Sequence, residues 1–191
     1  MRQQLLQTYL HQISQLSDQG IDQLVRIAQL KKLRKGEVLL EKGQICTGYY
    51  LVEAGFLCAH YEDGGKKVRT NFIFEGSFIS DLSSLREQTP SAMHIETGED
   101  GCFWLFDSKL LFECGMGSAE IMNFSHQLVS RLKLESAEYE NMVKLNKPAK
   151  RYTYISDNNP EILQRISFSQ LASYLGITKD TLGRIRKKDP L

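Results

Sequence analysis

The 191-residue sequence has no apolar run approaching the roughly 20 residues that a membrane-spanning helix needs. Its first ten residues are polar and amphipathic, and they lack the apolar core of a signal peptide. We therefore expect no membrane association and a location in the cytoplasm.

Cysteine is scarce and widely spaced. The four cysteines are Cys46, Cys58, Cys102 and Cys114, and no two of them form a Cys-x-x-Cys pair. This spacing argues against a zinc site and against an iron–sulfur cluster, because both usually need tighter groups of ligands. We expect no metal, and we expect free thiols that pack as small hydrophobic side chains.

Catalytic patterns are also missing. The sequence has no nucleophile elbow, no phosphate-cradling glycine loop and no set of metal ligands at a motif spacing. Its histidines are scattered and have no acidic partner at such a spacing; they are His11, His60, His94 and His126. We expect that the protein is not an enzyme.

The most informative segment is the C-terminal one, which has the pattern of two short helices joined by a tight turn. Ser167 followed by Gln170 is a capping-box start, and Gly176 stands where a helix ends in a left-handed conformation. Thr178 is placed to cap the second helix, and Leu182 to anchor its inner face. A hairpin of two helices in any helical domain is the alternative interpretation.

Positive charge is concentrated in the same segment. From residue 147 onward there are nine Lys or Arg against four Asp or Glu, a net charge of +5. The preceding 146 residues carry 15 basic and 19 acidic residues, a net charge of −4. A short helix with a buried back and a cationic front fits the major groove of DNA, and the charge favours contact with phosphates.

Upstream, two apolar stripes predict helices over the first 30 residues, with Ser17 as the cap of the second. From residue 31 to about residue 106, short segments rich in aromatic and β-branched residues alternate with glycine-marked turns, and Asp63-Gly64-Gly65 is the strongest hairpin signal. This pattern predicts a small antiparallel barrel or roll. The expected strands are residues 38–40, 49–52, 56–61, 68–74 and 102–106.

A long helix is expected from Ser118 to about Lys144, because this stretch has neither Gly nor Pro and carries an apolar stripe. A helix of about 25 residues is close to 40 Å long, which favours pairing with a second copy of the chain. Packing of the whole stripe on its own barrel is the alternative. Pro148 cannot continue the helix, so the expected domains are residues 1–117, 118–146 and 147–191.

The ordered combination of these elements resembles the CRP/FNR superfamily of bacterial transcription regulators. The matching residues are Lys35-Gly36, Gly43, Tyr50-Leu51-Val52, Gly55, Gly76-Ser77-Phe78-Ile79, Arg151-Tyr152, Ala172 to Thr178 and Thr181 to Arg186. The resemblance implies an α+β fold: N-terminal helices, an antiparallel β-roll (double-stranded β-helix) of the cyclic nucleotide-binding type, a long dimerisation helix and a C-terminal helix-turn-helix domain.

Carried over from the family, Lys179, Asp180 and Arg184 occupy the base-reading positions. Arg184 suits a bidentate contact to guanine, whereas Asp180 is shorter than the Glu usual there. The residues expected to position the helix on the DNA backbone are Ser169, Thr178, Thr181, Arg186 and Lys187. The sequence ends three residues after Lys188, so we expect binding without most of the β-wing that many relatives have.

The resemblance also places a candidate effector pocket in the roll. In cyclic-nucleotide-binding relatives a Glu binds the ribose and an Arg pairs with the cyclic phosphate; these positions align with Asp81 and Pro90. Proline has neither charge nor donor, and an unpaired buried phosphate is heavily penalised. Arg86 lies nearby in sequence and is the alternative cation, but nothing in the spacing requires that role, so cAMP and cGMP are not the expected effectors. The candidate pocket residues are Phe78, Ser80, Asp81, Pro90, Ser91 and Ser136.

The sequence therefore predicts a homodimeric, sequence-specific DNA-binding transcription regulator. Its expected partners are double-stranded DNA, a second copy of the chain, RNA polymerase and an unidentified small-molecule effector. The alternative is a small-molecule sensor or partner-binding module whose helix-turn-helix no longer binds DNA.

Overall fold

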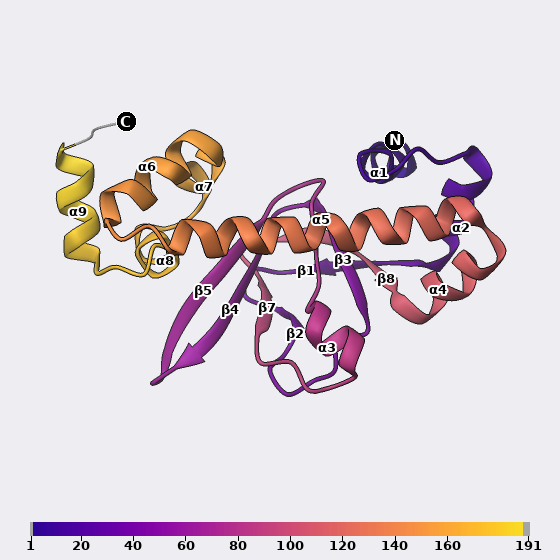
Figure 1. The fold of residues 1–191 in the computed structure, drawn as a ribbon, viewed down its shortest axis with the longest axis horizontal. Coiled ribbons are helices and arrows are strands. Elements are labelled where there is room, and N and C mark those ends of the chain that lie inside the picture. The colour runs from indigo at the N-terminus through magenta and orange to yellow at the C-terminus, as the bar shows by residue number, and fades with distance from the viewer. Residues whose placement is uncertain (1, 189–191) are drawn as a thin grey trace.

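A computed structural model describes residues 2–188. One long helix, α5 (Ala119–Val143), runs along the molecule, with the β-strands on one side of its middle, the N-terminal helices at one end and the C-terminal helices at the other (Figure 1). Within the described residues, no helix has the combination of length and apolar character needed to cross a bilayer.

The N-terminal part consists of α1 (Arg2–His11) and α2 (Asp18–Ile27). Ser17 caps α2, as expected, by accepting a hydrogen bond from the Gly20 amide. The Ser17 hydroxyl and amide also donate to the Glu120 carboxylate at 2.7 and 2.8 Å. This contact ties the start of α2 to the first turn of α5.

The β-roll is built from two antiparallel four-stranded sheets. The first sheet has the order β1 (Ala28–Leu33), β8 (Gly101–Asp107), β3 (Gly48–Ala54) and β6 (Phe78–Ile79). The second sheet has the order β2 (Val38–Leu40), β7 (His94–Thr97), β4 (Leu57–Asp63) and β5 (Lys66–Ile73). Between β6 and β7 lies the short helix α3 (Leu82–Glu87).

The five expected strands are present, but β1, β6 and β7 were not predicted. The helical start ends earlier than expected, because β1 begins at Ala28. Two lysines dilute the apolar pattern of β1, β6 has only two residues, and β7 has four residues of which one is apolar. The β4–β5 hairpin confirms its turn signal, since Gly64 and Gly65 both have positive φ angles, 53° and 75°.

The remaining helices are α4 (Ser108–Gly117), α6 (Pro148–Asn158), α7 (Pro160–Arg165), α8 (Phe168–Tyr174) and α9 (Lys179–Lys188). Ser167 and Gln170 form the expected capping box at the start of α8. Gly176 has the expected left-handed backbone after α8, with φ of 64°. The Thr181 amide donates to the Thr178 hydroxyl at 3.2 Å, which caps α9.

Most of the apolar stripe on α5 packs inside its own chain. Four of its side chains are buried against the N-terminal helices and the roll, and they are Ile121, Phe124, Leu128 and Leu132. Met142, near the other end of the helix, is buried among the C-terminal helices. For these residues the alternative interpretation holds, and the stripe does not by itself require a partner helix.

We predict that Phe124→Ala lowers the free energy of unfolding by about 3–5 kcal/mol, because it leaves a cavity beside α5. Phe124 is fully buried, whereas Phe112 on α4 is 60% exposed. The matched change Phe112→Ala should alter stability by less than about 0.5 kcal/mol. Urea unfolding followed by circular dichroism measures both, and equal effects would contradict the packing described.

Candidate nucleic-acid interface and effector cavity

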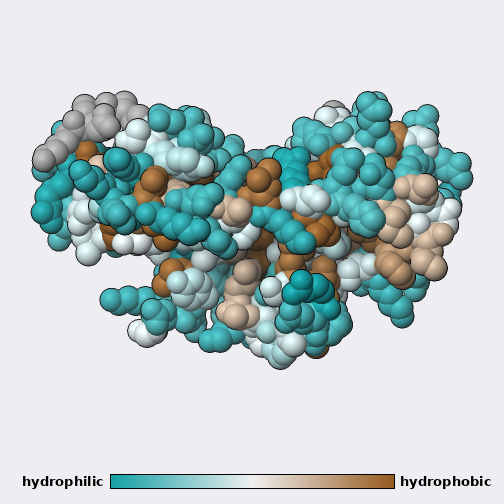
Figure 2. Space-filling view, in the orientation of Figure 1, coloured by the Kyte–Doolittle hydropathy of each residue, from teal (hydrophilic) through white to brown (hydrophobic). Residues whose placement is uncertain are grey.

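Helix α9 has a buried back and an exposed front. Leu182 is fully buried against the preceding helices, and Ile185 packs beside it. The side chains of Asp180 and Arg184 are exposed on the opposite face, and Lys179 is exposed at the first turn. Helix α9 lies at one end of the molecule (Figure 1), where the surface is mostly hydrophilic (Figure 2).

The residues expected to contact phosphates divide into two groups. Ser169, on the first turn of α8, and Lys187, on α9, are exposed and available. Thr178 and Thr181 hydrogen-bond to each other through their hydroxyls at 2.9 Å. The Thr178 hydroxyl is thus already engaged in capping α9.

The side chain of Arg186 packs against another side chain of the protein and is only partly exposed. Its guanidinium carbon lies 5.5 Å from the centre of the Phe168 ring, in a cation–π arrangement. Arg186 is half-buried, so it fastens α9 to the start of α8. The contact of Arg186 with the DNA backbone stays a prediction, as does that of Lys187.

The helix-turn-helix rests on the outer face of the second sheet. Tyr174 of α8 lies edge-on to Phe72 of β5 and stacks on Tyr139 of α5, with both ring centroids 5.2 Å away. The Ser173 hydroxyl donates to the Lys67 carbonyl at 2.7 Å and accepts from the Arg69 amide at 3.3 Å. Helix α8 is therefore joined to β5 by apolar packing and by main-chain hydrogen bonds.

Arg165, at the end of α7, provides a charged contact across the same junction. It donates to both carboxylate oxygens of Glu75 at 2.6 and 3.1 Å and also pairs with Glu99. Its guanidinium lies 4.9 Å from the centre of the Phe74 ring. Burial acts to raise the pKa of Glu75, but the hydrogen bonds from Arg165 and from the backbone outweigh it and hold that pKa below its usual value.

Arg151 braces the connection between α5 and the C-terminal helices. It donates to the Leu145 carbonyl at 2.6 Å, just beyond the end of α5, and to the Leu175 carbonyl at 2.9 Å, at the end of α8. One side chain thus connects the expected hinge region to the turn of the helix-turn-helix.

A cavity of about 360 Å³ lies between the roll and α5. In Figure 2, hydrophobic residues gather where α5 crosses the roll. The structure brings four of the candidate pocket residues to this cavity, namely Phe78, Ser80, Asp81 and Ser136. Pro90 and Ser91 do not line it.

The carboxylate of Asp81 is already engaged by the protein. One oxygen accepts from the Ser84 amide at 3.0 Å and caps α3, and the other accepts from the Ser91 hydroxyl at 2.7 Å. Ser80 likewise donates its hydroxyl to the Gly48 carbonyl at 2.9 Å. These side chains hold the α3 segment in place, and both oxygens of Asp81 accept hydrogen bonds from within the protein.

The cavity is acidic. None of the described residues that line it is Lys or Arg, and three are carboxylic acids, namely Asp81, Glu135 and Glu140. Burial raises the pKa of Glu135, although the hydrogen bond from Arg131 opposes this shift. An anionic ligand would find no cationic partner on the cavity wall.

Comparisons with known proteins agree with this architecture. Residues 30–115 match the family model of the cyclic nucleotide-binding domain, whereas no curated protein matches the sequence. The chain has the fold of a CRP/FNR-type regulator. The CRP/FNR resemblance and the predicted fold class are thereby confirmed.

Three solved structures illustrate this likeness. A protein described as a transcriptional regulator of the CRP/FNR family, from Eubacterium rectale, is 18% identical, with a TM-score of 0.67 over 91% of this chain and 83% of its own. The c-di-GMP-responsive global regulator CLP of Xanthomonas campestris is 15% identical, with a TM-score of 0.69 over 88% and 89%. FixK2 from Bradyrhizobium japonicum is 14% identical, with a TM-score of 0.69 over 85% and 84%.

Sequence reasoning missed the junction between the two halves of this CRP/FNR-type fold. Arg165 and its partners Glu75 and Glu99 are separated by 66 or more residues in sequence. Tyr174 and Phe72, whose rings are in contact, lie even farther apart in sequence. No local motif signals such contacts, so only the folded chain reveals them.

We predict that Arg165→Ala loosens the attachment of the helix-turn-helix to the roll. Loss of these partly exposed charge-assisted hydrogen bonds should cost about 1–2 kcal/mol. Hydrogen exchange measured by mass spectrometry should then be roughly 5–30-fold faster in the amides of α8. Arg86→Ala, which removes an exposed pair with Glu87 on α3, should leave α8 unchanged. Equal protection of α8 in all three proteins would contradict this role.

Proposed function

We propose that the protein is a homodimeric, sequence-specific DNA-binding transcription regulator that acts in the cytoplasm and does not respond to cAMP. In this proposal residues 1–117 are the sensor domain, residues 118–146 the dimerisation helix and hinge, and residues 147–191 the DNA-binding domain. The observation that carries it is α9, which exposes Lys179, Asp180 and Arg184 while Leu182 anchors its back. Contact with RNA polymerase, which the resemblance implies, belongs to the same proposal.

The charge distribution supports a groove-reading role for α9. Arg184 carries two parallel donors for guanine O6 and N7, and Asp180 offers acceptors for a cytosine amino group. Lys179 adds a further exposed cation at the first turn. The net charge of +5 from residue 147 onward attracts the phosphate backbone, and exposed Ser169 and Lys187 would position the helix there.

Dimerisation is supported by a different face of α5 from the one that the sequence suggested. Leu134 is 62% exposed, and Ser130 and Ala137 are exposed one turn on either side. Gln127 and Asn141 extend this uncharged stripe at alternating steps of three and four residues. Such spacing is typical of a helix that pairs with another helix, and a two-fold pair would present two copies of α9 to successive major grooves.

The acidic cavity supports an effector other than a cyclic nucleotide. Asp81 lines the cavity but already accepts hydrogen bonds from the Ser84 amide and the Ser91 hydroxyl. Pro90 lies away from the cavity wall and offers neither charge nor donor, so the position that pairs with the cyclic phosphate in relatives is not filled. Glu140 and Glu135, the latter paired with Arg131, supply no cation for a cyclic phosphate. An uncharged or cationic small molecule fits the wall better. Its binding would change the angle between the DNA-binding domains through α5.

We predict that Arg184→Ala lowers the preference for the best-bound duplex over random duplex by about 1–3 kcal/mol, because a bidentate base contact is lost. Fluorescence anisotropy with labelled duplexes measures the two affinities. Arg86→Ala, which removes an exposed arginine on α3, is the matched control and should retain the full preference. An unchanged preference in Arg184→Ala would exclude the base-reading role.

Lys187→Ala should behave differently, since its proposed contact is with phosphate. It should weaken all duplexes alike and reduce the slope of log affinity against log salt by about 1. A wild-type protein without any salt-dependent affinity for duplex DNA would support the alternative, a sensor whose helix-turn-helix no longer binds DNA.

We predict that cAMP does not bind more tightly than about 1 mM, because a buried phosphodiester would lack a cation and face carboxylates. Isothermal titration calorimetry with the purified full chain measures this directly. Glu135→Gln, which removes one carboxylate from the cavity wall, is titrated with cAMP in the same way. Micromolar binding of cAMP to the wild-type protein would overturn the argument from the acidic wall.

A further inference from the structure

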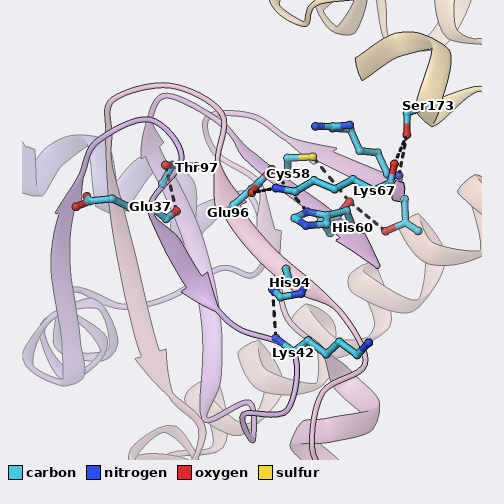
Figure 3. Close-up of polar contacts among 12 residues, drawn as sticks. Glu37, Lys42, Cys58, His60, Lys67, His94, Glu96, Thr97 and Ser173 are labelled. Atoms are coloured by element: carbon cyan, nitrogen blue, oxygen red, sulfur yellow. Dashed lines mark hydrogen bonds and ion pairs between the residues drawn. The ribbon is translucent and has the colours of Figure 1, made fainter. Parts of the chain in front are cut away.

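Four residues with metal-binding side chains form a block on two paired strands. Cys58 and His60, two positions apart, share one face of β4, and Glu96 and His94 lie directly opposite them on β7. Figure 3 shows Cys58, His60 and Glu96 converging, with His94 beside the His60 ring. The block is separate from α9 and does not line the effector cavity.

The distances suit a single ion. The ligand atoms of Cys58, His60 and Glu96 all lie within 4.8 Å of one another. His60 Nδ1 and Glu96 Oε1 are 3.7 Å apart, close to the roughly 3.5 Å between two ligands of a tetrahedral zinc ion. Small side-chain rotations would bring the Cys58 sulfur to the same spacing.

The imidazole of His60 lacks a hydrogen-bond partner at the nitrogen that faces this cluster. The residue is only 2% exposed, and its Nδ1 has no hydrogen-bond partner among the described residues. Buried polar atoms are rarely left in this state. The ring is held in plane by stacking on His94, with centroids 5.0 Å apart, so Nδ1 is fixed toward Glu96.

We propose that Cys58, His60 and Glu96 bind one divalent transition-metal ion of the zinc type. Thiolate, imidazole and carboxylate are all ligands that zinc accepts in tetrahedral sites, and the thiolate selects against Mg²⁺ and Ca²⁺. Three protein ligands leave the fourth position to a water molecule. The spacing rule that argues against a zinc site in the sequence does not apply, because the ligands come from two strands.

Two cationic side chains border the cluster and affect how it would bind a metal ion. Lys67 Nζ lies 2.7 Å from Glu96 Oε2, and the Lys67 side chain is 46% exposed, so it can turn into solvent when a metal arrives. Arg69 is the second cation, and it lies close enough to hydrogen-bond the Cys58 thiol. Because a metal ion binds cysteine as the thiolate, metal binding at Cys58 would release the thiol proton.

The site lies beneath the attached C-terminal helices. Cys58 belongs to the same apolar cluster as Tyr174 of α8. The backbone carbonyl of Lys67, the lysine that a metal would displace from Glu96, accepts the hydrogen bond from Ser173. The proposed ion would thus be enclosed between the roll and the helix-turn-helix.

Cobalt(II) is a suitable probe, because it occupies zinc sites and absorbs strongly when a thiolate binds it. The full chain, treated with a chelator and reductant, is titrated with Co²⁺ and then with Zn²⁺. We expect one equivalent of Co²⁺ per chain, a thiolate-to-cobalt charge-transfer band, and displacement by Zn²⁺. Absence of binding, or binding without the thiolate band, would overturn the proposal.

Variants separate this site from incidental binding elsewhere. Cys58→Ser should abolish the charge-transfer band, and Glu96→Gln, a change of nearly equal shape, should weaken binding by at least about tenfold. Cys114→Ser removes a thiol outside the cluster and should leave the band and affinity unchanged. A band that persists in Cys58→Ser, or that disappears in Cys114→Ser, would contradict the assignment.

The variant Lys67→Gln is expected to change the affinity for Co²⁺ in the opposite direction. Because it removes the cation that competes for Glu96, it should tighten Co²⁺ binding severalfold, which a merely structural cluster would not do. Circular dichroism checks that each variant is folded. Unchanged or weaker binding in folded Lys67→Gln would contradict the proposed role of Glu96 as a ligand.

Discussion

The packing of α8 against the outer face of β5 is the contact on which the arrangement of this molecule depends. Tyr174 lies between Phe72 of β5 and Tyr139 of α5, and Ser173 bonds to the β5 backbone. This contact buries the back of the helix-turn-helix and leaves α9 directed away from the roll. The roll, the long helix and the C-terminal helices therefore share one apolar cluster.

Charge is distributed unequally between the two halves of the chain. The cavity between the roll and α5 is lined by Asp81, Glu135 and Glu140, which suits an uncharged or cationic occupant. The segment from residue 147 onward carries a net charge of +5, which suits a polyanion. The pairs of Arg165 with Glu75 and Glu99 join the C-terminal helices to the roll.

Local features of the fold could be predicted from the sequence, because each depends on a few neighbouring residues. Ser167 and Gln170 predict the start of α8, and Gly176 predicts its end. Gly64 predicts the β4–β5 turn. The short strands β6 and β7 could not be predicted, since partners distant in sequence stabilise them. The same applies to the cluster around His60 and to the engagement of Asp81, which depend on which strands lie side by side.

The central claim is that two copies of α9, paired through α5, read DNA together. Selection of bound sequences from a random duplex pool tests this claim most directly. The account predicts enrichment of a two-fold symmetric sequence whose half-sites lie about 10 base pairs, roughly 34 Å, apart. Failure to enrich any sequence, or enrichment of a single unpaired half-site, would contradict it.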